Sequence, residues 1–218
     1  MPDRYLPSLA SFGLTAEEQA AVTLALASPD PWKWNPGAAQ AELIVSAKNK
    51  IRDHHLLRHG EKCCYCRTNL HGTGHFTIDR EHILPKSIAA YRGLSYEIWN
   101  LGIACKRCNM EYKKDKIDFV VSPQDTTLFG DGANYLFVHP NFDLYREHLS
   151  RSSLEEEESV LVKYTVVEES LKGAYTYEYF NLRGLEINSF DLAQGLDAND
   201  SLSEGALEVR SLADEYRQ

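Results

Sequence analysis

Two Cys-x-x-Cys patterns, Cys63-Cys64-Tyr65-Cys66 and Cys105-Lys106-Arg107-Cys108, decide how the middle of this chain folds. Thiolates two residues apart can bind one soft cation from a single tight turn, and two such turns complete a closed four-coordinate site. The spacing predicts a structural zinc ion bound by Cys63, Cys66, Cys105 and Cys108, with Cys64 as a thiol outside the ligand set. The alternative is a group of buried thiols without metal. The 38 residues between the two turns exceed the usual loop of about 15 to 20 residues, so a further element is inserted there.

The composition is that of a soluble, folded protein. Its 218 residues are 43% hydrophobic and 25% charged, which argues against disorder and against a disulfide-rich miniprotein. Five cysteines are an odd number, and metal ligands or buried thiols in a reducing compartment explain them better than disulfides do. The longest apolar stretch, residues 20–27, is too short to span a membrane, and residues 1–14 lack the apolar core of a secretory signal. We expect a cytoplasmic protein without a membrane partner.

Charge is distributed unevenly along the chain. The net charge is −9, but the formal charges of residues 1–50, 51–116 and 117–218 are −1, +5 and −13. A modestly basic middle segment is compatible with a nucleic-acid partner, because phosphate neutralisation dominates that kind of affinity. The acidic last third favours a basic protein partner instead.

The elements before and after the cysteines predict an α+β fold. Thr15 and Glu18 form a capping-box pattern for a helix that reaches Leu26, and residues 38–57 have helical periodicity. The later runs Val160–Val167 and Ala174–Phe180 predict a β-hairpin around Lys172-Gly173, and Ser203–Tyr216 predicts a closing helix. The expected organisation is an N-terminal helical region (1–59), a zinc-binding core (60–118) and an acidic α+β extension with β structure (119–218).

The insertion carries a second pattern. It reads Phe76-Thr77-Ile78-Asp79-Arg80-Glu81-His82-Ile83-Leu84-Pro85-Lys86, then Trp99-Asn100-Leu101, and it returns through Cys105-Lys106-Arg107-Cys108-Asn109 to Lys113. These residues resemble the HNH, or ββα-metal, endonucleases of the four-cysteine zinc subtype. The resemblance covers roughly residues 60–116, about a quarter of the chain. It implies a ββα-metal core whose base is clamped by the two cysteine turns.

The resemblance implies a metal-dependent nuclease that hydrolyses phosphodiester bonds of DNA. In that family His82 matches the general base, and Glu81 and Asn109 match the ligands of a catalytic Mg²⁺ or Mn²⁺ ion. Oxygen donors of this kind suit a hard cation. Asn100 matches the central Asn that holds the imidazole and its loop, and Lys113, one helical turn beyond Asn109, is expected to face the same phosphate. Glu stands where Asp is commoner, and Asn where His is commoner, so the preferred metal stays open.

A narrower similarity is to the HNH subunit of Septu-type antiphage systems, in which the nuclease works beside an ATPase of the ABC or SMC class. It rests on the helical lead-in before the cysteines and on three stretches, Gly60–Cys66, Glu81–Ser87 and Ile98–Leu101. A function in antiviral defence with an ATPase partner is what this similarity implies.

Several residues have more than one interpretation. Asp79 is expected to form a surface ion pair with Arg80 or Lys86. The alternative is that its carboxylate contacts a residue that binds the catalytic metal. A set of cations could contact nucleic-acid backbone or be solvated, namely Lys86, Arg92, Lys106, Arg107, Lys114 and Lys116. The alternative function is a zinc-stabilised module that binds nucleic acid or protein without catalysis. Cleavage of RNA is a third, because such a site reads a phosphodiester and not a base.

Overall fold

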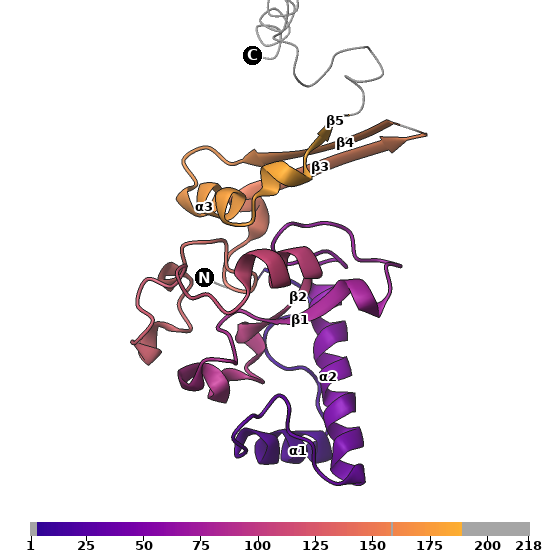
Figure 1. Ribbon diagram of the computed structural model, residues 1–218, viewed down its shortest axis with the longest axis vertical. Coiled ribbons are helices and arrows are strands. Elements are labelled where there is room, and N and C mark those ends of the chain that lie inside the picture. The colour runs from indigo at the N-terminus through magenta and orange to yellow at the C-terminus, as the bar shows by residue number, and fades with distance from the viewer. Residues whose placement is uncertain (1–3, 158, 189–218) are drawn as a thin grey trace, which may run out of the picture. The chain divides into compact units, whose positions relative to one another are not determined.

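The structure, a computed structural model, describes residues 4–157 and 159–188. It contains both helices and strands, as an α+β fold requires (Figure 1). Of the described residues, 4–151 and 164–184 form one compact unit, and 185–188 and the described part of 152–163 belong to a second. None of the helices in these ranges is long and apolar enough to cross a membrane.

Two helices open the first unit. Helix α1 (Ala16–Leu26) begins at Thr15, whose side chain accepts a hydrogen bond from the backbone N–H of Glu18 while the Glu18 carboxylate accepts one from the backbone N–H of Thr15. This is the capping box that the sequence predicts. Helix α2 (Ala38–Arg58) follows the proline-containing segment 29–36 and also agrees with its prediction.

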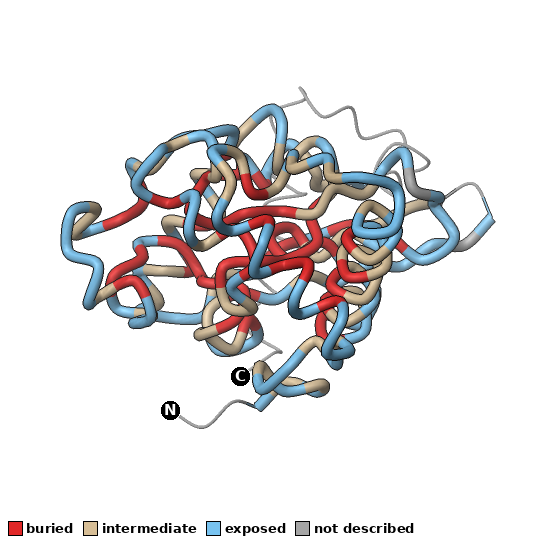
Figure 2. The backbone as a smooth tube through the Cα atoms, turned by 90° about the horizontal axis from the view of Figure 1, so that it is seen from below, coloured by how far each residue is buried: buried red, intermediate tan, exposed pale blue. Residues whose placement is uncertain are grey.

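The core of this part lies between α1, α2 and the strand β2 (Leu101–Cys105). Ala21, Val22 and Ala25 of α1 and Ile44, Ala47 and Ile51 of α2 are buried together with Tyr96 and Leu101. Figure 2 marks the buried residues in red. Because Leu101 is the first residue of β2, α2 packs against the sheet that carries the insertion and fixes its position.

Strands β1 (Ile78–His82) and β2 (Leu101–Cys105) pair antiparallel, with Glu81 opposite Gly102 and His82 opposite Leu101. The short helical segment Arg107–Lys113 follows β2 and has π-type hydrogen bonding. The described order is therefore strand, strand, helix. The long connection from β1 to β2 contains the short helices Ala89–Leu94 and Ile98–Asn100.

The later part of the chain differs from its prediction. Strand β4 (Ser159–Val166) exists, but it lies between β3 (Leu149–Glu156) and β5 (Ile187–Asn188). The predicted strand Ala174–Phe180 is instead part of helix α3 (Leu171–Tyr179), so the predicted hairpin is wrong. The predicted helix Ser203–Tyr216 lies outside the described residues.

Local capping and tertiary packing explain why α3 is helical. The Ser170 hydroxyl accepts a hydrogen bond from the backbone N–H of Gly173, which caps the helix. The hydroxyl of Thr176 donates to the Lys172 carbonyl and accepts from the backbone N–H of Val138. These contacts outweigh the β preference of this Tyr-rich run, because such a preference depends strongly on context.

Candidate metal centre and adjoining buried polar site

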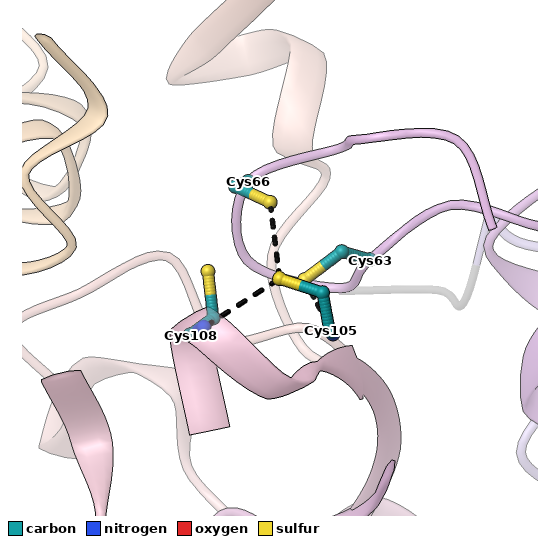
Figure 3. Close-up of side chains that lie close together, drawn as sticks. All are labelled: Cys63, Cys66, Cys105 and Cys108. Atoms are coloured by element: carbon teal, nitrogen blue, oxygen red, sulfur yellow. Dashed lines mark hydrogen bonds between the residues drawn. The ribbon is translucent and has the colours of Figure 1, made fainter. Parts of the chain in front are cut away.

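Four cysteines from three elements converge at the end of strand β2. Cys63 and Cys66 come from the turn that follows α2, Cys105 ends β2, and Cys108 lies in the segment Arg107–Lys113 (Figure 3). Their sulfur atoms all lie within 4.8 Å of one another, and the Sγ atoms of Cys66 and Cys105 are 3.7 Å apart. Tetrahedral zinc with Zn–S bonds of about 2.3 Å separates its sulfurs by about 3.8 Å. The four cysteines could therefore hold a metal such as zinc, as predicted.

Backbone hydrogen bonds shape the turn and stabilise negative charge on sulfur. The Cys63 N–H donates to the Thr68 carbonyl, and the Arg67 N–H donates to the Cys63 carbonyl. The N–H of Cys105 lies 3.3 Å from Cys63 Sγ. Burial raises the pKa of the Cys63 thiol, whereas hydrogen bonds from the Cys105 and then the Cys108 thiols hold the pKa of Cys66 well below its usual range.

Cys64 lies outside this cluster, as predicted, and is buried against β2. Its backbone N–H donates to the Ile103 carbonyl over 2.8 Å. A Cβ atom added to Gly102 would lie 3.4 Å from Cys64 Sγ, an ordinary van der Waals distance, so the thiol packs directly against this residue of β2. The close packing joins the cysteine turn to the strand that pairs with Glu81.

A buried ion pair lies next to the cysteine turn. The Glu81 carboxylate is 2% exposed and the Lys113 side chain 1% exposed, and Lys113 Nζ lies 2.7 Å from Glu81 Oε1. The same Oε1 accepts a hydrogen bond from the Tyr65 hydroxyl over 3.1 Å. Burial raises the pKa of Glu81, while Lys113 and Tyr65 oppose that shift. Burial also raises the pKa of Tyr65 well above its usual value, so its hydroxyl is a donor at neutral pH.

Lys113 uses its ammonium entirely inside the protein. Besides Glu81, it donates to the carbonyl of His82 over 2.6 Å and to that of Lys114 over 3.3 Å. Three acceptors match the three N–H bonds of a lysine. The sequence predicts that Lys113 faces a phosphate. In the structure its side chain instead contacts Glu81 and the backbone of His82.

His82 is a buried, neutral imidazole with one ring nitrogen engaged. Its Nε2 lies 3.1 Å from the Ser95 carbonyl oxygen, which can only accept a hydrogen bond, so the ring proton is on Nε2. Among the described residues Nδ1 has no hydrogen-bond partner. Burial, followed by the positive charge of Lys86, holds the pKa of His82 well below its usual range. The ring of Trp32 lies nearly perpendicular to the imidazole, with the two ring centroids 4.5 Å apart.

Asn100 organises the loop around His82. Its Oδ1 accepts a hydrogen bond from the Leu84 N–H over 2.7 Å, and its Nδ2 donates to the carbonyls of Leu84 and Leu94. The side chain is fully buried. Asn100 therefore ties the backbone at Leu84 to that at Leu94.

Asn109 and Asp79 form a pair at the edge of the site. The amide Nδ2 of Asn109 donates to Asp79 Oδ2 over 3.1 Å, and Lys106 Nζ lies 3.4 Å from Asp79 Oδ1. The expected ion pair of Asp79 with Arg80 or Lys86 is therefore wrong, because Lys106 and Asn109 occupy its carboxylate. The contact orients Asn109 with its amide oxygen away from Asp79.

Part of this site lines a cavity of about 260 Å³. Glu81, His82, Asn109 and Lys113 line it, so the structure brings together four of the predicted site residues. Four further cations also line it, namely Lys33, Arg80, Lys86 and Lys114, together with Asp30 and Asp115. Arg107, another predicted backbone contact, donates instead to the carbonyls of Phe180 and Asn181.

Sequence reasoning did not single out three residues of this site. Trp32 and Ser95, which contact His82, carry no local signal in the sequence. Tyr65 stands inside the first Cys-x-x-Cys pattern, and this position was the sequence feature that could have pointed to it.

Comparison with models of protein families, with curated proteins and with solved structures finds no match to this chain.

Proposed function

We propose that this protein is a metal-dependent endonuclease that hydrolyses phosphodiester bonds of DNA, with His82 as the general base. The observation that carries the proposal is the state of His82. Its ring is neutral, its proton is on Nε2, and the buried Nδ1 has no hydrogen-bond partner among the described residues. His82 and Glu81 both line the cavity that Lys33, Arg80, Lys86 and Lys114 also line. A neutral imidazole held in one tautomer is suited to accept a proton from water.

In the proposed reaction the oxygen of a water molecule attacks phosphorus while its proton passes to Nδ1 of His82. The bond from phosphorus to the leaving oxygen breaks, and that oxygen takes a proton from solvent. The cavity of about 260 Å³ has room for water, whose share of liquid volume is about 30 Å³ per molecule. Lys33, Arg80, Lys86 and Lys114 supply positive charge for the phosphate backbone.

The donor atoms fit a hard divalent cation. Tyr65 and Lys113 both contact Oε1 of Glu81, and Oε2 has no hydrogen bond among the described residues, so it is available as a ligand. Asn109 offers its amide oxygen on the same cavity. We propose that Glu81 and Asn109 hold Mg²⁺ or Mn²⁺, with water and phosphate completing the shell. Such an ion would stabilise the charge that develops on the leaving oxygen.

The association with an ATPase in antiphage defence is also a proposal, and sequence resemblance alone supports it. It implies that the nuclease can need a partner for full activity. The cleavage test below is therefore run with the purified chain and with any ATPase that co-purifies with it.

Nicking of supercoiled plasmid tests the proposed function. Zinc-loaded wild type, His82→Ala and the exposed control His71→Ala are compared with Mg²⁺, with Mn²⁺ and with neither ion. We expect wild type and His71→Ala to cut only with added ion, and His82→Ala to be slower by about 10² to 10⁴-fold. Because the pKa of His82 lies well below 6.5, the rate should stay level as the pH falls from 7 to 6.5 and decline only under more acidic conditions.

Equal cutting by wild type and His82→Ala would contradict the assignment of the base. Absence of cutting by wild type, with and without its partner, would favour a zinc-stabilised binding module. An RNA strand of the same sequence, tested in parallel, distinguishes cleavage of DNA from cleavage of RNA.

A further inference from the structure

We infer that Tyr65 is a positioning residue through which the cysteine turn orients the metal-binding carboxylate of Glu81. This inference rests on the proposed function, because it concerns the same catalytic cation. The inference goes beyond the proposed function because it connects the structural metal centre and the catalytic one through a single side chain.

The position of Tyr65 is fixed at both ends. Its backbone lies inside the turn Cys63–Cys66, where the neighbouring Cys64 N–H donates to the Ile103 carbonyl of β2. Its ring stacks on Phe180 at a centroid distance of 4.4 Å and meets Phe137 edge-on at 5.5 Å. The side chain is 1% exposed. A ring held in this way leaves its hydroxyl little freedom to move.

The hydroxyl acts on one chosen atom of Glu81. It donates to Oε1, the oxygen that Lys113 also contacts. With both donors on Oε1, Oε2 is the oxygen left to bind a cation. Without Tyr65, Lys113 would be the single remaining donor to the carboxylate among the described residues, and the carboxylate could rotate about its terminal bond. We therefore expect Tyr65 to set the orientation of Oε2 and not to contact the cation itself.

Tyr91→Phe provides a matched control. Tyr91 is also 1% exposed, and its hydroxyl donates to the Pro123 carbonyl over 3.0 Å, away from Glu81. Tyr65→Phe and Tyr91→Phe each remove one buried hydroxyl and one hydrogen bond. Only the first variant should disturb the proposed cation site.

The test measures Mn²⁺ binding by electron paramagnetic resonance on full-length, zinc-loaded wild type, Tyr65→Phe, Tyr91→Phe and Glu81→Gln. Zinc content, melting temperature and plasmid nicking are measured on the same samples. For Tyr65→Phe we expect one zinc per chain and a Mn²⁺ dissociation constant raised about tenfold, within the range for loss of a partner of a metal ligand. Nicking should recover as the Mn²⁺ concentration is raised.

Mn²⁺ affinity of Tyr65→Phe within twofold of wild type, while Glu81→Gln loses binding, would overturn the inference and leave the proposed function intact. Loss of zinc or of the fold together with Mn²⁺ would also overturn it, because Tyr65 would then be merely structural. If wild type binds no Mn²⁺, or Glu81→Gln binds it as wild type does, the proposed cation site itself fails and the inference fails with it.

Discussion

The buried pair of Glu81 and Lys113 should show strong energetic coupling. The side chains are 2% and 1% exposed and their charged atoms lie 2.7 Å apart. Removing one partner of a buried ion pair typically costs about 3 to 5 kcal/mol, because the other charge is left uncompensated. Replacing both partners with uncharged groups of similar volume costs much less. We therefore expect Glu81→Gln and Lys113→Met each to lower the free energy of unfolding by about 3 to 5 kcal/mol.

The double variant is the decisive measurement. It should lose no more stability than either single variant, so the coupling energy should be about 3 kcal/mol or more. Urea unfolding at a fixed zinc concentration, followed by tryptophan fluorescence, gives each free energy from its midpoint and slope. The corresponding changes Asp30→Asn and Lys33→Met serve as the control, because these side chains are 49% and 78% exposed. Their coupling energy should be less than about 0.5 kcal/mol. If the two buried substitutions add to within about 0.5 kcal/mol, the ion pair does not exist as described.

Three further predictions concern the rest of the first unit. Hydrogen bonds from Lys50, then from Ser46, lower the pKa of Glu18 to about 2, so the contribution of its carboxylate to stability is complete above pH 4.5 and is lost as the pH falls toward 2. Glu18→Gln should therefore lower the free energy of unfolding by about 1 kcal/mol at pH 7. Urea titrations should show the difference in stability between wild type and the variant shrinking only below pH 4.5. Gly173→Ala would bring a Cβ to 2.1 Å from the His148 carbonyl oxygen, and it should lower stability by about 1 to 3 kcal/mol in the same assay, whereas Gly93→Ala, with open space around it, should not. Metal analysis should find tightly bound zinc lost in Cys108→Ser and kept in Cys64→Ala, and equal zinc in both would refute the ligand set.

Local signals predicted the parts of the fold that local physics controls. The capping box at Thr15, the periodicity of α2 and the two Cys-x-x-Cys turns each depend on residues a few positions apart, and the structure contains all three. The strand predicted at Ala174–Phe180 failed because distant contacts decide that segment. The hydrogen bond from Val138 to Thr176 and the stacking of Phe180 on Tyr65 are invisible in a local pattern.

The candidate site shows the same division. The family resemblance assigned Glu81, His82 and Asn109 to one site, and in the structure all three line one cavity. It did not predict that Lys113 would be buried, since a lysine one turn beyond Asn109 reads as exposed. Nor could it supply Trp32, which reaches His82 from a loop that precedes it by 50 residues. Such contacts follow from how α1 and α2 pack, not from the motif.

The route of the chain bears on how this protein can be cut for experiment. The unit that contains the four cysteines and the buried polar site consists of two stretches of sequence, one ending at Arg151 and the other beginning at Tyr164. The Tyr164 hydroxyl donates to the Cys66 carbonyl over 2.6 Å, and the ring of Phe180 covers Tyr65. A truncation that begins in the acidic third, as the linear charge map invites, would strip these supports from the cysteine turn. Charge reversal at exposed acids of an intact chain is therefore the sound way to ask what that third of the sequence binds.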